Sequence, residues 1–258
     1  MPRRFRVLWC APLLLGACRP DTVDLRYRFP QGVREYRMDV SVDARWDIGG
    51  PGRGSYRWVA DVSEEVTQDG DTAVVEVTMS PVRVEERELS SPGTQERTFT
   101  LRVDRNGGVE AVLEVNGVDA TQLSPEDIAF IGTFRPPLPV DPVGLGDEWE
   151  SEGPDAQRRS QQVPTTGRLE SLYRDSDGPV AEVVYTGGGP LGWEAELPLG
   201  SSEFTGSAET SGSAAFDIED GVLRSAASSL EGEFVVRVIQ ASGAGTPVTG
   251  TMDLDLDL

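Results

Sequence analysis

Pairs of adjacent acidic residues are the feature of this sequence that comes nearest to a catalytic motif. Two neighbouring carboxyl groups can supply the acid and the base that glycoside hydrolysis requires, and such pairs occur at Glu64–Glu65, Glu85–Glu86 and Asp147–Glu148. The chain contains 44 acidic residues, however, so acidic pairs arise from composition alone. We therefore expect these carboxylates to lie on a solvated surface and the protein not to be an enzyme; a carboxylate-based hydrolase is the alternative.

Three aspartates, Asp253, Asp255 and Asp257, alternate with leucines at the end of the sequence. Every second residue of a strand points to the same face, so these carboxylates would stand about 7 Å apart, near enough to share a divalent cation. The simpler interpretation is the solvated face of a strand, at a sheet edge that charge protects from unwanted pairing. We expect the simpler case, with no metal and no cofactor.

Histidine and lysine are missing from the composition: no histidine occurs, and all 23 basic residues are arginines. The chain therefore cannot form a Ser-His-Asp triad, a histidine-ligated metal site, a lysine Schiff base or a P-loop. The formal net charge is -21, and the phosphates of nucleic acid repel such a surface. We expect no nucleic-acid partner.

The N-terminus has the order of a secretory signal. Three arginines within the first six residues precede an apolar run over residues 7–15, which is too short to span a membrane as a helix. The four residues that end at Cys18, LGAC, resemble a bacterial lipobox. That resemblance implies that Cys18 is lipidated on sulfur and becomes the first mature residue; the alternative is an ordinary signal peptide with an incidental cysteine.

The lipobox resemblance divides the chain into a signal peptide over residues 1–17, a lipidated N-terminus over 18–21 and a mature domain over 22–258. It places the protein in the cell envelope, on the outer membrane or on the outer face of the cytoplasmic membrane, with the Cys18 lipid as its membrane anchor. The other cysteine, Cys10, lies in the segment that is removed. No thiol is then left for a disulfide, so the mature domain must be stabilised by its core alone.

Alternation of apolar and polar residues indicates strands through most of the mature chain. From Tyr36 to Ile48 every even position is apolar and every odd position is polar or charged, which predicts a strand with one buried and one solvated face. Similar segments recur along the sequence, separated by Asp-Gly and Asn-Gly turns that are typical of hairpins. The predicted fold class is therefore all-β and mainly antiparallel, with about a dozen strands, and strands of such length suit a strongly curved sheet or half-barrel.

A short helix and a proline-rich crossing interrupt the strands in the middle of the chain. Ser124 is a suitable N-cap before a proline, which predicts a helix over residues 125–131. The segment that follows combines prolines with apolar residues, which favours a strap packed across the sheet over a free linker. We predict a single β domain whose halves, 22–122 and 146–258, are joined by this helix and strap over 123–145.

The order of these elements resembles that of envelope lipoproteins akin to the LolA and LppX half-barrels. The resemblance rests on the repeated long hairpins, the capped apolar helix and the crossing over residues 136–149, which ends in Leu-Pro-Val and then Gly-Asp-Glu-Trp. It implies a curved antiparallel sheet that is lined by apolar side chains, lidded by helices and able to hold acyl chains in its hollow. Typical carriers have several lid helices, whereas one is predicted here.

Aromatic and apolar residues are the candidates for such a hollow. Most aromatic residues fall on the apolar phase of their predicted strands, a pattern typical both of a plain core and of a lined groove. The candidate ligand-binding residues are Trp46 and Trp58 on the sheet and Ile128, Ile131, Phe134 and Leu138 on a movable lid. We predict a monomeric binding protein for a lipid or other apolar ligand; the alternative is an acidic surface scaffold or interaction protein with no small-molecule ligand.

Overall fold

The computed structural model describes residues 22–30, 32–47, 50–68, 72–91, 93–122, 135–151, 164–197, 200–240 and 248–257. In chain order its elements are β1 (Val33–Asp47), β2 (Pro51–Gln68), β3 (Thr72–Arg87), β4 (Arg97–Asp104), β5 (Val109–Val115), β6 (Val118–Asp119), the 3₁₀ turn η1 (Ala120–Gln122), β7 (Glu148–Ser151), β8 (Thr165–Asp175), β9 (Gly178–Leu197), β10 (Gly200–Asp217), β11 (Val222–Gln240) and β12 (Val248–Asp257). The prediction of an all-β, mainly antiparallel fold is confirmed.

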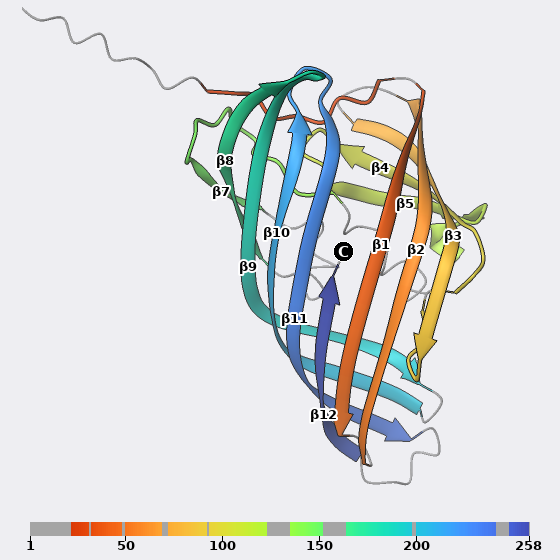
Figure 1. The fold of residues 1–258 in the computed structure, drawn as a ribbon. Coiled ribbons are helices and arrows are strands. Elements are labelled where there is room, and N and C mark those ends of the chain that lie inside the picture. The colour runs from red at the N-terminus through yellow and green to blue at the C-terminus, as the bar shows by residue number, and fades with distance from the viewer. Residues whose placement is uncertain are drawn as a thin grey trace, which may run out of the picture.

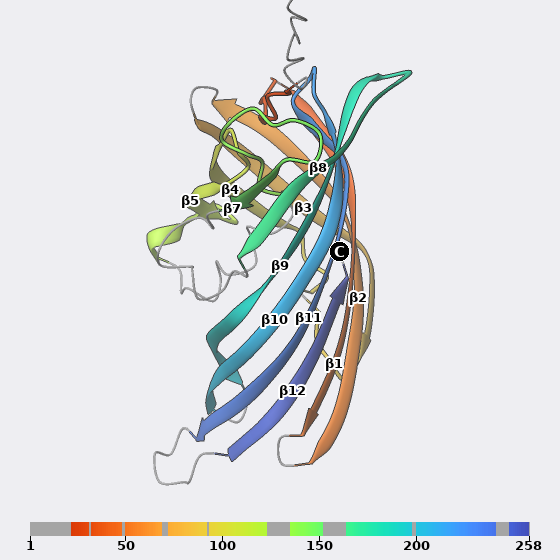
Figure 2. The same ribbon diagram turned by 90° about the vertical axis from the view of Figure 1, so that its left-hand side faces the viewer.

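The strands lie side by side in the order β6-β5-β4-β3-β2-β1-β12-β11-β10-β9-β8-β7. Each half of the chain is thus a meander of antiparallel neighbours, and the β1–β12 ladder joins the two meanders (Figure 1). Figure 2 shows the long strands running side by side along the molecule, with β4, β5 and β7 together on one side of them.

The strong curvature that we predicted is not found, since the described strands form no closed or strongly curled sheet. The outermost strands, β6 and β7, span only two and four residues. Strands this short can form only a few backbone hydrogen bonds, too few for β6 and β7 to pair with each other and close the sheet. Short edge strands also limit unwanted pairing with other chains.

The alternating pattern of β1 places its apolar residues in the interior as predicted. Val40, Val42 and Ala44 are at most 3% exposed. Arg45, at the alternate phase of this strand, is exposed. The strand begins at Val33 rather than at the first residue of the alternating pattern. Local pattern therefore sets which face is buried, while pairing with neighbours sets where the strand starts.

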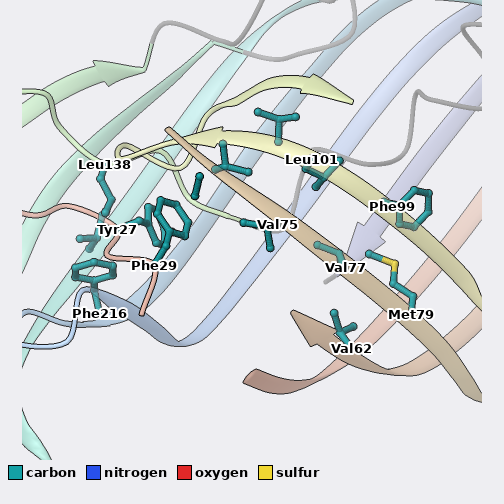
Figure 3. Packing of buried hydrophobic residues seen from close by; sticks show 14 of the residues in the cluster. Tyr27, Phe29, Val62, Val75, Val77, Met79, Phe99, Leu101, Leu138 and Phe216 are labelled. Atoms are coloured by element: carbon teal, nitrogen blue, oxygen red, sulfur yellow. The ribbon is translucent and has the colours of Figure 1, made fainter. Parts of the chain in front are cut away.

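The N-terminal segment, residues 22–30, crosses one end of the sheet and ties the two meanders together (Figure 1). The Tyr27 amide donates to the carbonyl of Arg105 in the β4–β5 turn (2.7 Å), and the Arg28 amide donates to the carbonyl of Gly221 in the β10–β11 turn (2.8 Å). Tyr27 packs edge-on against Phe216, with ring centroids 5.3 Å apart. Figure 3 shows this aromatic group continuing into the valines of β3 and the apolar side chains of β4.

The proline-rich segment over residues 135–143 packs into this core. Leu138 and Val143 are buried, the Leu138 amide donates to the carbonyl of Asn106 (2.9 Å), and Val143 pairs with Val23. Trp149 adds a hydrogen bond from its indole nitrogen to the Pro137 carbonyl (3.2 Å). The predicted helix over 125–131 lies outside the described residues.

Candidate binding cavity at the open seam

β12 separates β1 from β11 along only part of their length. In β1, Ser41–Asp47 pairs with β12, and in β11, Ser229–Val238 pairs with it. Within the described residues, Val33–Val40 of β1 pairs with β2 alone and Val222–Ser228 of β11 pairs with β10 alone. We call these two facing stretches the open seam; Figure 1 shows the C-terminal end of β12 below it, between β11 and β1.

A cavity of about 780 Å³ lies along the open seam. Its lining comes from β1, β2, the start of β11 and two residues of the crossing segments, namely Tyr27, Arg34, Glu35, Tyr36, Arg37, Met38, Asp39, Ser41, Arg57, Val62, Glu64, Arg135, Leu223, Arg224, Ser225 and Ala226. The lining therefore combines apolar side chains with five arginines and three acids, in a chain whose net charge is -21.

Burial along β1 and β11 changes where β12 ends. In β1 the inward positions Val42 and Ala44, which pair with β12, are buried, whereas Tyr36 and Met38, on the same face beyond it, are only half-buried. In β11 the stretch from Ser225 to Ala227 is exposed. Apolar surface of β1 is thus open to the cavity.

A buried ion pair forms part of the inner wall. Nη2 of Arg135 lies 2.5 Å from Oε1 of Glu64, and both side chains are at most 6% exposed. The Arg135 guanidinium also stands 6.0 Å from the ring centroid of Tyr27 and 5.9 Å from that of Phe29, within reach of a cation–π attraction. The pair fixes the proline-rich segment to β2.

Glu64 is buried, which corrects the expectation of a solvated surface for this one member of the acidic pairs. The other five members are exposed as expected, namely Glu65, Glu85, Glu86, Asp147 and Glu148. The Glu64 side chain falls in phase with Val62 and Val66, the inward residues of β2, so the alternating pattern already contained a signal of its burial. No sequence signal distinguishes Arg135 from the other arginines, because its partner Glu64 on β2 is 71 residues away in the chain.

Two tyrosines beside the ion pair have altered acidities. Burial raises the pKa of Tyr27 above its ordinary value of 10, although the nearby Arg135 works against this. The Tyr27 hydroxyl donates to the Pro136 carbonyl (3.2 Å). Burial also raises the pKa of Tyr36. Both phenols therefore remain neutral hydrogen-bonding groups well above neutral pH.

Ion pairs hold the arginines at the rim of the cavity. Arg57 binds Asp39 through two nitrogens in an exposed pair, and this hydrogen bonding lowers the pKa of Asp39. Arg224, whose side chain is 22% exposed, binds Asp175 of β8 and the buried Asp217 of β10. These contacts orient the two guanidinium groups of the lining.

The predicted ligand-binding residues that the structure describes, Trp46, Trp58 and Leu138, are not part of the lining of this cavity. Trp58 is buried and donates from its indole nitrogen to the Gly93 carbonyl (3.0 Å), and Leu138 is buried in the core. Trp46 lies over Gly52 of β2; a Cβ added to Gly52 would lie 2.1 Å from the indole nitrogen of Trp46. Ile128, Ile131 and Phe134, together with Cys18, lie outside the described residues.

The three alternating aspartates of the last strand stand in register with β1: Asp253 with Arg45, Asp255 with Asp43 and Asp257 with Ser41. Among the described residues no group of three or more His, Cys, Asp or Glu is placed to hold a metal ion. The part of the chain that the structure describes also has no helix long and apolar enough to cross a membrane.

The open seam itself was not predicted. Its lining residues come from strands far apart in the sequence, which local pattern does not bring together. No protein-family model matches the chain, and no curated protein matches it.

Proposed function

We propose that this is a non-enzymatic binding protein of the cell envelope, anchored through lipid on Cys18, whose ligand is an elongated molecule with an apolar side held along the open seam. The observation that carries the proposal is the cavity of about 780 Å³ that is lined by β1, β2 and the start of β11. Ligand sites of proteins are concavities of about 300–1,000 Å³ with apolar walls and a few placed polar groups.

The chemistry of the lining supports an amphipathic ligand. Tyr36, Met38 and Leu223 offer apolar contact from two strands. Arg37 and Arg57, each paired with an aspartate, add guanidinium groups to the lining. A lipid, as the resemblance to the half-barrel lipoproteins implies, fits this description, and so does any other elongated molecule with one apolar and one anionic side. The proposal includes no catalytic step.

The test is native mass spectrometry of the full chain, exported in cells and extracted from membranes in mild detergent, followed by organic and acid extraction of whatever is bound. We expect a near-stoichiometric ligand, and Met38→Asp should remove most of it, because a carboxylate would enter the apolar side of the cavity. Val235→Asp is the matched control, since Val235 is an exposed apolar residue of β11 that does not line the cavity.

Two outcomes would contradict the proposal. One is an empty protein that stays empty when lipids and peptides are added; the other is equal ligand loss in the two variants. Thermal unfolding of both variants checks that Met38→Asp acts on the cavity rather than on the fold.

A further inference from the structure

We propose that the segment over residues 140–145 is a membrane-contact surface, which places its exposed apolar side chains in a neutral lipid surface and so fixes the orientation of the protein on the membrane. This inference rests on the anchoring part of the proposed function, because it takes the lipid on Cys18 as the tether. It does not depend on the ligand cavity, whose lining contains no residue of this segment.

Three exposed apolar residues lie close together on this segment. Val140 and Leu145 are the most exposed large apolar side chains among the described residues, at 73% and 63%, and Pro142 between them is also exposed. We call these three residues the apolar tip. A chain extends at most about 3.6 Å per residue, so Val140 lies within about 11 Å of Val143 and Leu145 within about 7 Å. Grouped apolar side chains at a surface mark contact sites for proteins or membranes.

Contacts on both sides hold the apolar tip outward. Before it, the side-chain amide of Asn106 donates to the Pro139 carbonyl (2.6 Å). After it, the Gly146 amide donates to the Leu169 carbonyl (2.8 Å). Val143, in the same segment, is only 6% exposed, so the inward side of the segment is already packed against the core. The side chains of the apolar tip therefore cannot turn inward to leave water.

The proposed lipid anchor is attached close to the apolar tip. Val23 pairs with Val143 through two backbone hydrogen bonds, of 2.8 and 2.9 Å. Cys18 precedes Val23 by five residues, and five residues of chain extend at most about 18 Å. A lipid on Cys18 keeps the membrane surface within this distance of Val23. The membrane then faces the end of the sheet that residues 22–30 cross (Figure 1).

Tethering makes so small an apolar contact effective. Two or three side chains bind a lipid surface too weakly to hold a free protein, but a linker of a few residues gives them an effective concentration in the millimolar range. Burial of Val140 and of Leu145 then favours the docked state by about tenfold or more each. The anchored protein is therefore held with the apolar tip in the membrane surface and does not swing freely on its tether.

Charge selects the kind of lipid surface. Asp141, Asp147 and Glu148 are exposed on the apolar segment and just after it, and the Asp24 carboxylate is paired with Arg26 (2.7 Å). The net charge of the whole chain is -21. Anionic headgroups repel such a surface, so zwitterionic phospholipids are the partner that fits.

The test places a fluorescent label beside the apolar tip in the full chain, exported, lipidated and reconstituted into phosphatidylcholine vesicles. Asp141→Cys supplies the site of the label, because Cys18 carries the lipid and Cys10 is removed with the signal peptide, so the introduced thiol is the only one in the mature chain. Phospholipids that carry a nitroxide on the acyl chain quench a label at the bilayer. We expect strong quenching, and weaker quenching when phosphatidylglycerol is mixed into the vesicles at low salt.

A matched pair of double variants tests the side chains. Val140→Asp combined with Leu145→Asp should lower the ratio of docked to undocked protein about hundredfold, which is about tenfold for each side chain, and most of the quenching should be lost. Val82→Asp combined with Val235→Asp is the control, because it makes the same change of charge at exposed apolar residues, 48% and 53% exposed, on β3 and β11. Equal quenching in the two double variants would overturn the inference. Thermal unfolding checks that both variants fold.

Intact mass separates this inference from the proposed function. If Cys18 carries lipid but the label is not quenched in vesicles, the inference fails and the proposed function stands. If Cys18 carries no lipid, the proposed anchoring fails and the inference fails with it. In the released Cys18→Ser protein without detergent, the label should be open to quenching by iodide; a shielded label would show that a second copy or another segment covers the apolar tip, and would overturn the inference.

Discussion

Glu64 and Arg135 form an ion pair whose side chains are at most 6% exposed. Removing one partner leaves the other charge buried without compensation, which typically costs 3–5 kcal/mol. We expect Glu64→Gln to lower the free energy of unfolding by about 3 kcal/mol, whereas Glu64→Leu combined with Arg135→Met should cost much less, since a well-packed apolar replacement of a buried pair is often neutral. Urea unfolding of the two variants measures the difference.

The exposed pair Arg53–Asp43 is the control for this prediction. Its side chains are 65% and 46% exposed, and exposed pairs contribute about 0–1 kcal/mol. Arg53→Met should therefore have little effect. If Glu64→Gln were no more damaging than Arg53→Met, the buried pair would have no special role in the wall of the cavity.

Tyr27 couples stability to alkaline pH. Burial raises its pKa in the folded protein, so the neutral phenol stabilises the fold below the unfolded pKa of about 10, and this contribution is lost as pH rises above 10. Tyr27→Phe should cost about 1 kcal/mol at pH 7, through the lost hydrogen bond to Pro136. Above pH 10 the difference in free energy of unfolding between the wild type and Tyr27→Phe should narrow or reverse, because phenylalanine cannot ionise.

Unfolding by urea at pH 7 and at about pH 11 measures both parts of this prediction. Tyr173→Phe is the matched control, since the Tyr173 side chain is 44% exposed. A gap between wild type and Tyr27→Phe that stays constant across this pH range would show that Tyr27 does not ionise on unfolding.

At the scale of elements, glycines opposite aromatic residues allow the long central strands to pack. Gly206 of β10 lies beneath Phe234 of β11; an added Cβ would meet the Glu233 carbonyl oxygen at 2.0 Å. Gly206→Ala should therefore lower the free energy of unfolding by about 1–3 kcal/mol. Gly188→Ala, on β9, meets only ordinary contacts at 3.7 Å and should be neutral or stabilising by up to about 1 kcal/mol. Chemical denaturation compares the two, and equal effects would contradict the packing argument.

Much of the element level was predictable from local pattern. Period-two alternation located β1 and the strands that follow it, because solvation of one face is a property of each strand alone. The shape of the sheet was not predictable in the same way, because the curvature of the sheet and the joining of β1 to β12 depend on pairing between distant strands. The candidate site was missed for this reason, since Met38 and Ala226 line one cavity only because β12 joins β1 to β11.

The aromatic residues illustrate the same limit. Trp46 and Trp58 share the apolar phase of their strands, and local pattern cannot tell a buried side chain from one that lines a groove. In the structure Trp58 is enclosed and Trp46 covers a glycine. Distinguishing the two roles requires knowledge of what lies on the other side of the sheet.

At the scale of the whole molecule, anchoring through Cys18 is a proposal that substitution tests directly. Cys18→Ser should remove the lipid mass from the exported protein and release it from the membrane fraction, because the serine oxygen cannot take the place of the sulfur. Cys10→Ser is the control, since Cys10 lies within the predicted signal peptide and its loss should change neither the mass nor the location. Intact-protein mass spectrometry and membrane fractionation provide the measurement.

The pairing of β1 with β12 also bears on how fast the protein folds. The residues that it joins are more than 200 positions apart in the chain, whereas most other ladders connect strands adjacent in sequence. Closing so long a loop is entropically costly and comes late. Each meander can therefore form early as an independent hairpin array, and the final, slow phase of folding is the meeting of the two at β12; until then the edges of β1 and β12 are open to mispairing.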